Sequence, residues 1–162
     1  MELAEACLRT SGELIGALRA ARTPGFKLGK REPGDSEGTT AVRKIIQERL
    51  KTALEAWSNF TQQYSLAPFY FDNAPQPSPA DQLTGVLLEL SVTAEMMFTY
   101  EQGEDLGGRL TEPLRTVRKE FYFHEGAEPD DIERTIRAAD TQLRDFFGPI
   151  LRSGTTWSCR LW

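Results

Sequence analysis

The sequence predicts an all-α protein, a single-domain bundle of five helices built from two antiparallel helical hairpins plus an N-terminal helix. Five segments repeat apolar residues every three or four positions. Proline and glycine gather between those segments, and no alternation of strand and helix patterns occurs. The chain has 162 residues, of which 40% are hydrophobic and 27% charged. Such a chain can form one core without disulfides or metals, so we place the bundle at residues 1–152 and a non-periodic C-terminal tail at 153–162.

The first two expected helices flank one long connection. The first covers residues 2–22, since its apolar residues fall on one stripe. Thr23-Pro24-Gly25 ends it, and proline and glycine then make residues 23–38 a long mobile loop. The second helix begins at Thr39 or Thr40 and runs to Tyr64, with apolar residues at alternating spacings of three and four.

The third expected helix begins at Ser78-Pro79, where the N-cap and first-turn residues agree, and ends near Gly103. Its apolar residues form two stripes, which are Leu83, Leu87, Leu90, Ala94 and Met97, and Leu88, Val92, Met96 and Tyr100. Because a helix that is apolar over so much of its circumference is usually central, we expect the other helices to pack around it. The fourth and fifth helices are expected at residues 110–123 and 129–147, with the apolar pattern continuing to Ile150.

The triplet Phe-Tyr-Phe occurs twice, at residues 69–71 and 121–123. Each triplet is followed by an acidic, proline-bearing loop and an X-Pro-X-Asp helix start. We interpret the two triplets as corners of two hairpins, where aromatic rings close the bundle end; internal duplication is the alternative. Three consecutive aromatic residues cannot all face one core, so at least one ring of each triplet should be exposed.

The middle of the chain is acidic. The net charge is −5, and no Lys or Arg occurs between Lys51 and Arg109. We therefore predict a protein partner with a basic surface, bound through acidic residues on and after the third helix, namely Glu89, Glu95, Glu101, Glu104 and Asp105. The alternative is that this acidic surface faces water, or faces the basic first loop within the same fold.

These observations favour a non-catalytic interaction protein or regulatory subunit. A sharper version is an acidic immunity or inhibitor protein, whose carboxylates take the place of phosphates in a nuclease or toxin. We predict no cofactor and no metal, because the chain has one His and two Cys and lacks glycine-rich nucleotide-binding patterns. We also predict no enzyme, since no Gly-x-Ser-x-Gly nucleophile motif and no Cys-His framework is present.

A small helical subunit of a nucleic-acid-binding ribonucleoprotein complex is the first alternative function. Basic residues around the long loop would contact phosphates, namely Lys27, Lys30, Arg31, Arg43 and Lys44. Glu32, Asp35 and Glu37 interrupt this basic run. Nucleic-acid binding is therefore expected only within a larger assembly.

The only histidine, His124, gives the second alternative. Arg118 precedes it by six positions, a spacing that resembles the Arg-to-His motif of the helical ribonucleases of the HEPN class. The resemblance implies His124 as a general acid or base and Arg118 as a phosphate-binding residue. We favour a structural interpretation, because a helix C-terminus stabilises histidine electrostatically. The acidic residues that follow are interpreted as first-turn residues of the fifth helix instead of metal ligands.

The sequence also bears on the compartment. No apolar run approaches the roughly 20 residues that span a bilayer, and the acidic start is unlike a secretion signal. Cys7 and Cys159 are interpreted as free thiols in a reducing compartment. We therefore predict a cytoplasmic protein without membrane contact.

Overall fold

The fold is all-α throughout the part of the chain that the structure describes. The structure is a computed structural model that describes residues 1–24, 36–104, 112–122 and 128–153. Its helices are α1 (Glu2–Arg22), α2 (Ser36–Tyr64), α3 (Ala67–Tyr70), α4 (Pro79–Glu104), α5 (Glu112–Phe121) and α6 (Asp131–Ser153). No strand occurs among these residues, so the predicted helical-bundle class is confirmed. None of the described helices has the length and apolarity that crossing a membrane requires.

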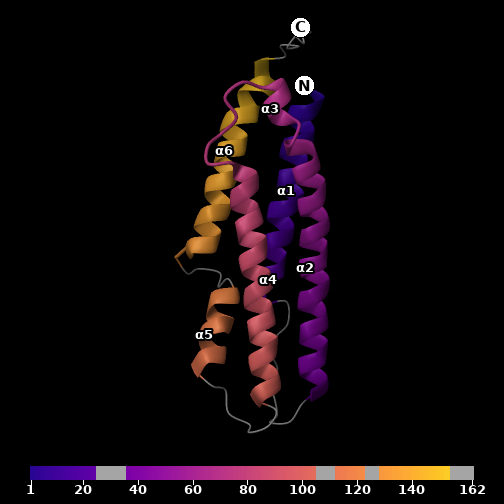
Figure 1. Ribbon diagram of the computed structural model, residues 1–162, viewed down its shortest axis with the longest axis vertical. Coiled ribbons are helices and arrows are strands. Elements are labelled where there is room, and N and C mark those ends of the chain that lie inside the picture. The colour runs from indigo at the N-terminus through magenta and orange to yellow at the C-terminus, as the bar shows by residue number, and fades with distance from the viewer. Residues whose placement is uncertain (25–35, 105–111, 123–127, 154–162) are drawn as a thin grey trace.

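The long helices form an elongated bundle in which neighbours run antiparallel (Figure 1). α1 and α4 run in one direction, and α2, α5 and α6 run in the other. α1 packs against α2 and α6, whereas α4 packs against α2, α5 and α6. The described part is thus an up-down-up-down bundle of four columns, and its fourth column consists of α5 followed by α6.

The pairing of the last two helices differs from the predicted second hairpin. α5 and α6 run in the same direction, one after the other, and α4 is the antiparallel neighbour of both (Figure 1). Helix length explains this arrangement. The 26 residues of α4 span about 39 Å, whereas the 10 residues of α5 span about 15 Å and cover only part of that length. The rest of α4 is covered by α6.

The core lies along the axis of the bundle. Side chains that are completely buried come from all four columns: Leu14, Leu18, Phe60, Leu83, Leu90, Phe121, Ile136, Leu143 and Phe147. At the end near α3, Phe71 packs edge-on against Phe146 and Phe147, with ring centroids 6.1 and 5.6 Å apart. Tyr64 contacts Phe147 in the same way at 6.5 Å. These aromatic pairs close this end of the bundle, as the sequence predicts for the first Phe-Tyr-Phe triplet.

The two triplets lie in unrelated surroundings. In the first, Phe69 and Tyr70 are exposed at the end of the bundle while Phe71 is buried, which confirms the expected exposure of at least one ring. In the second, Phe121 is buried where α5 ends, partway along the bundle (Figure 1). The prediction that both triplets close a bundle end is wrong for the second one. This difference also argues against internal duplication.

Helix boundaries agree with the sequence except where local signals are weak. Ser78 accepts a hydrogen bond from the backbone N–H of Asp81 at 3.5 Å, as its N-cap position predicts. α2 begins at Ser36, so the expected loop of residues 23–38 is shorter, and residues 25–35 of it lie outside the described chain. α6 continues through Pro149 to Ser153. The single turn α3 is too short to show any period and was not predicted.

Candidate functional site

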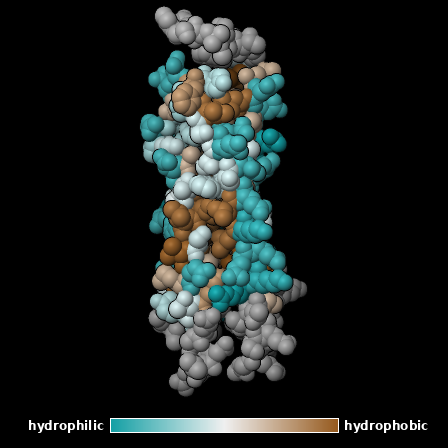
Figure 2. All heavy atoms as spheres, turned by 45° about the vertical axis from the view of Figure 1, so that its right-hand side comes forward, coloured by the Kyte–Doolittle hydropathy of each residue, from teal (hydrophilic) through white to brown (hydrophobic). Residues whose placement is uncertain are grey.

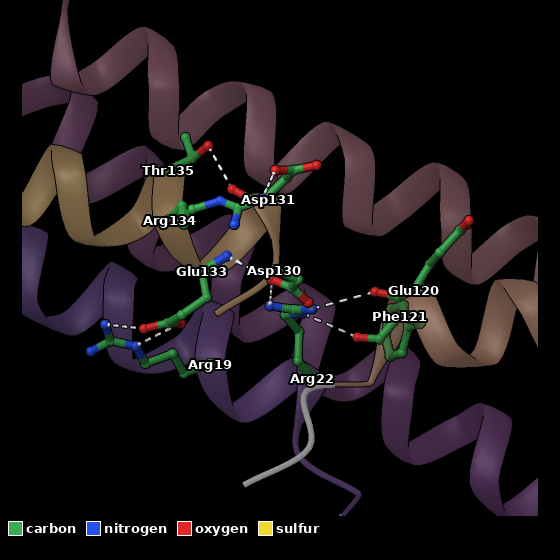
Figure 3. Close-up of polar contacts among 9 residues, drawn as sticks. All are labelled: Arg19, Arg22, Glu120, Phe121, Asp130, Asp131, Glu133, Arg134 and Thr135. Carbon is green, nitrogen blue, oxygen red and sulfur yellow. Dashed lines mark hydrogen bonds and ion pairs between the residues drawn. The ribbon is translucent and has the colours of Figure 1, made fainter. Parts of the chain in front are cut away.

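Arg22, the last residue of α1, joins α5 to α6 (Figure 3). Its side chain is only 1% exposed. The guanidinium donates hydrogen bonds to the carbonyl oxygens of Phe121, at 3.1 Å, and Glu120, at 3.3 Å. It also donates to both carboxylate oxygens of Asp130, with the Nη1–Oδ1 distance at 3.1 Å. One buried cation therefore contacts the end of one helix and the start of the next.

We call the contacts of Arg22 with Glu120, Phe121 and Asp130 the α5–α6 joint. This joint explains why α5 and α6 stack end to end. The last carbonyls of a helix have no partner within it, and Arg22 supplies one for Glu120 and Phe121. Asp130 is the N-cap of α6, because its Oδ1 accepts a hydrogen bond from the backbone N–H of Glu133 at 2.9 Å. The same carboxylate balances the charge of Arg22. The joint thus satisfies two helix ends and one buried charge together.

A second ion cluster lies beside the joint, between α1 and α6. Glu133 is buried, and its carboxylate accepts hydrogen bonds from Arg19 at 2.8 and 3.3 Å and from Arg137 at 2.9 Å. In Figure 3 Arg19 and Arg22 reach from α1 toward the first turn of α6. The predicted role of the carboxylates at the start of α6 was a favourable interaction with the helix dipole. Asp130 and Glu133 have a further role, because their hydrogen bonds with Arg22 and Arg19 connect α6 to α1.

The contacts of these carboxylates lower both pKa values. Burial raises the pKa of Asp130, but the hydrogen bonds from Arg22 and from the backbone of Glu133 outweigh burial, so the pKa lies below its ordinary value. Burial likewise raises the pKa of Glu133, and the hydrogen bonds from Arg19 and Arg137 lower it further than burial raises it. Both groups are therefore charged at neutral pH. Their charges hold the joint together.

An open groove of about 620 Å³ lies where α4, α5 and α6 meet. It is lined by Glu89, Thr116, Lys119, Glu120, Asp130, Asp131 and Ile132. Four of these side chains are carboxylates and one is a lysine. Asp130 is paired with Arg22 and Asp131 with Arg134, so the negative character of the groove comes from Glu89 and Glu120. No three or more His, Cys, Asp or Glu side chains in the described residues are arranged to hold a metal ion. The groove is consequently a negative surface that suits cationic groups of a ligand or partner.

The outer face of α4 carries an exposed apolar stripe next to this groove. Its members are Leu88, Val92, Met96 and Tyr100, which are 62, 60, 43 and 36% exposed. Figure 2 shows apolar side chains gathered in a patch on one face of the bundle, with hydrophilic side chains beside it. The expectation that α4 is central is wrong for this face. Each helix of a four-column bundle buries one side, and α4 buries the stripe of Leu83, Leu87, Leu90, Ala94 and Met97.

Carboxylates lie on both sides of the α4 stripe. Thr84 faces α2, because it accepts a hydrogen bond from Trp57 Nε1 at 2.8 Å. Glu95 lies three helical turns further along and hence on the α2 side. Gln82 faces α6, where its side chain bonds Gln142 at 3.1 Å, and Glu89 follows two turns later on that side. Both glutamates are exposed.

One apolar residue of α2 extends the stripe. Trp57 pairs with Thr84, and the guanidinium of Arg43 lies 4.8 Å from the centroid of the Phe98 ring. These two pairs fix the antiparallel register of α2 and α4, and in that register Leu54 lies level with Leu88. Leu54 is 53% exposed. The apolar surface therefore reaches from α4 to the edge of α2.

The structure brings together part of the predicted partner-binding set. Glu89 and Glu95 are exposed on α4, on either side of the stripe. Glu101 and Glu104 belong to the end of α4, but their side chains lie outside the described ones, as does all of Asp105. Their role stays a prediction.

The residues of the two alternative functions are only partly described. Lys27, Lys30 and Arg31 lie outside the described residues, and so does His124, so the HEPN-like spacing is not tested. Lys44 is exposed on α2, whereas Arg43 packs over Phe98 and helps to hold α2 against α4. Arg118 is half-buried on α5.

Cys7 is a free thiol on the buried side of α1, and burial raises its pKa to about 11. A thiol with such a pKa is protonated at neutral pH and is a poor nucleophile or metal ligand. Cys159 lies outside the described residues. The described cysteine is accordingly a small core residue.

Fold and surface together define the class: an up-down-up-down helical bundle that presents an apolar stripe between carboxylates. No protein-family model, curated protein or solved structure matches the chain.

Proposed function

We propose that this protein is a non-catalytic interaction protein that binds a basic partner protein through the outer face of α4. The observation that supports this proposal is the stripe of Leu88, Val92, Met96 and Tyr100, exposed between Glu89 and Glu95. The stripe lies within residues 52–108, where the chain has no Lys or Arg. A contiguous apolar patch with a polar rim is typical of protein-binding surfaces.

The apolar stripe and the carboxylates around it have distinct physical roles in the proposed complex. Covering the stripe removes apolar area from water and supplies binding free energy. The carboxylates of the rim and of the groove attract a basic partner and orient it, and they repel acidic proteins. In the finer form of the proposal the partner is a nuclease or toxin, and the carboxylates occupy the places of nucleic-acid phosphates. The same surface would suit a regulatory subunit that binds a basic enzyme. We also propose a cytoplasmic setting.

Zero-length carbodiimide cross-linking in cell extract tests this proposal, because the reagent joins carboxylates directly to lysines that touch them. Tagged wild-type protein is expected to give a cross-linked complex in which Glu89 or Glu95 is bonded to a lysine of the partner. Val92→Glu places a charge in the middle of the stripe and should abolish that product. The measurement is mass spectrometry of the cross-linked peptides.

Ala138→Glu is the matched control, since Ala138 is exposed on α6 and the substitution adds the same charge away from α4. The control should give the wild-type cross-links. If Val92→Glu and Ala138→Glu give the same products as the wild type, the α4 face is not the binding surface and the proposal is rejected.

A further inference from the structure

We infer that the segment bound on the α4 face is an amphipathic helix of the partner with lysine or arginine along both edges of its apolar side. This inference rests on the proposed function and specifies its partner. Its apolar side covers Leu88, Val92 and Met96, and its basic residues lie beside Glu89 and Glu95. Three features of the α4 face point to such a helix: the shape of the stripe, the hydrogen-bonded backbone under it, and the sign of the charges around it.

The stripe is an inclined row with the length of a short helix. Its four members are spaced by four residues, so each lies next to the following one, and the row winds about a third of a turn around α4 from Leu88 to Tyr100. The rise over this row is about 18 Å, which matches about 12 residues of a second helix that crosses α4 along it. Leu54 is exposed on α2 at the level of Leu88. Side chains of a partner helix would pack against the stripe and against Leu54.

The backbone under the stripe offers nothing to an extended peptide. An added β-strand needs unpaired backbone N–H and C=O groups at a sheet edge, and no strand occurs in the described residues. Within α4 the backbone groups beneath the stripe bond to one another along the helix. Contacts on this face therefore come from side chains. Packing an apolar helix face against an apolar helix face is the mode that suits them.

Charge decides which helix fits. Glu95 lies on the α2 side of the stripe, while Glu89 lies on the other side and also lines the acidic groove. Glu120 extends the negative surface on that side, whereas Asp130 and Asp131 are paired with Arg22 and Arg134. A lysine or arginine at either edge of the bound helix meets a carboxylate, and an acidic residue is repelled.

The same charges disfavour a second copy of this chain as the occupant. α4 contains no lysine or arginine. Two α4 faces packed on each other would place Glu89 and Glu95 of both copies around one apolar seam, without a cation from either helix to balance them. A basic helix from a different protein avoids this repulsion.

A designed peptide tests the inference with the full-length protein. The probe is a stapled helical peptide of about 14 residues with leucine on one face and lysine at both edges, labelled with a fluorophore. A leucine/glutamate peptide with the same pattern is the charge control, and a shuffled leucine/lysine peptide that has no apolar face is the shape control. Fluorescence anisotropy should show binding of the first peptide and at least about tenfold weaker binding of both controls.

Three variants locate the binding. Val92→Glu should weaken the leucine/lysine peptide about tenfold, because a charge replaces an apolar contact, while Ala138→Glu should leave it unchanged. Glu89→Lys combined with Glu95→Lys should reverse the preference, so that the leucine/glutamate peptide binds more tightly. All three changes are at exposed positions, and circular dichroism with thermal melting should match the wild type.

Equal binding of the two patterned peptides, or no reversal by the double variant, would overturn the role of charge. A dimer in sedimentation equilibrium that Val92→Glu dissociates would assign the face to a second copy and overturn the inference. If the lysine cross-links of the wild type persist while the leucine/lysine peptide does not bind, the partner presents a different kind of surface. In that case the helix inference fails and the proposed function stands.

Discussion

The α5–α6 joint and the outer face of α4 reverse the usual distribution of side chains. At the joint Arg22 is buried and Asp130 is partly buried, with three helix segments around them. On the outer face of α4, Leu88 and Val92 are more than half exposed. Charges are normally exposed and large apolar side chains are normally buried.

The difference shows that available partners, rather than polarity alone, decide where a side chain lies. Arg22 finds two carbonyls and a carboxylate inside the bundle, so its burial is balanced. Leu88 and Val92 find no helix of the described chain on their side of α4. We expect the joint to matter for stability and the α4 face to matter for binding, and the following changes test that division.

Arg22→Ala should have the largest effect. It leaves the buried carbonyl of Phe121, and the partly exposed carbonyl of Glu120 and carboxylate of Asp130, without their guanidinium, and it leaves a cavity at a side chain that is 1% exposed. We expect the free energy of unfolding to fall by about 3 to 4 kcal/mol, as for other broken buried ion pairs. Urea denaturation followed by circular dichroism measures it.

Arg19→Ala is the comparison, because Arg19 is 45% exposed and the buried carboxylate that it bonds, Glu133, keeps its hydrogen bond from Arg137. Its effect should stay near about 1 kcal/mol. Equal losses for the two variants would show that burial of Arg22 does not give the joint its importance.

Leu90→Ala should have the next largest effect. Leu90 is completely buried and Leu88, two residues earlier on the same helix, is 62% exposed. We expect Leu90→Ala to lower the free energy of unfolding by about 3 kcal/mol, since it leaves a cavity in the core. Leu88→Ala should change it by less than about 0.5 kcal/mol. A large loss for Leu88→Ala in urea denaturation would mean that this face is covered in solution.

The fold was largely predictable from the sequence because helical periodicity is a local signal. α1 spans the predicted residues 2–22, and α4 ends one residue after the predicted Gly103. Ser78 caps α4 as expected. The end-to-end stacking of α5 and α6 was not predictable, because the contacts at their junction come from Arg22, which is about 100 residues away along the chain. An arginine in the last turn of a helix looks like an ordinary response to the helix dipole.

The candidate site was predictable only in part. The absence of Lys and Arg between positions 51 and 109 pointed to Glu89 and Glu95, which are exposed. Leu88, Val92, Met96 and Tyr100 were recognised as a stripe but assigned to the core. Periodicity shows that residues share a face, and two apolar stripes on one helix do not show which of them other helices cover. Which of the two stripes is buried depends on how the helices pack, and a single sequence does not show helix packing.

Lowering the pH should weaken the joint and the ion cluster beside it, through the carboxylates of Asp130 and Glu133. The pKa values of Asp130 and Glu133 lie below their ordinary values of 3.8 and 4.5 in the folded state. Their contribution to stability is therefore complete above about those values and is lost as the pH falls through the folded-state pKa. The free energy of unfolding should stay level from pH 7 to about 5 and then decline.

Asp130→Asn removes one of these titrating groups, so the free energy of unfolding of this variant should decline less steeply in acid. At pH 7 it should be about 1 to 2 kcal/mol below that of the wild type. Asp145→Asn removes an exposed carboxylate of α6 outside the joint and serves as control. Urea denaturation at a series of pH values compares the three proteins. An unchanged acid slope in Asp130→Asn would contradict the assignment of acid sensitivity to the joint.

Val92→Thr should have the smallest effect on stability, and for that reason it separates the two regions most cleanly. The substitution replaces a methyl group with a hydroxyl at nearly constant volume, at a side chain that is 60% exposed. A buried hydroxyl without a partner would cost about 1 to 3 kcal/mol, whereas an exposed one bonds to water, so we expect a change within about 0.5 kcal/mol. Urea denaturation at two protein concentrations provides the measurement.

A loss above about 1 kcal/mol that grows with protein concentration would show that copies of the chain bury Val92 against one another. A loss independent of concentration would show that another part of the same chain covers it. Stability that is unchanged at both concentrations leaves the α4 face free for a different protein, because the fold then gains nothing from the apolar residue at this position.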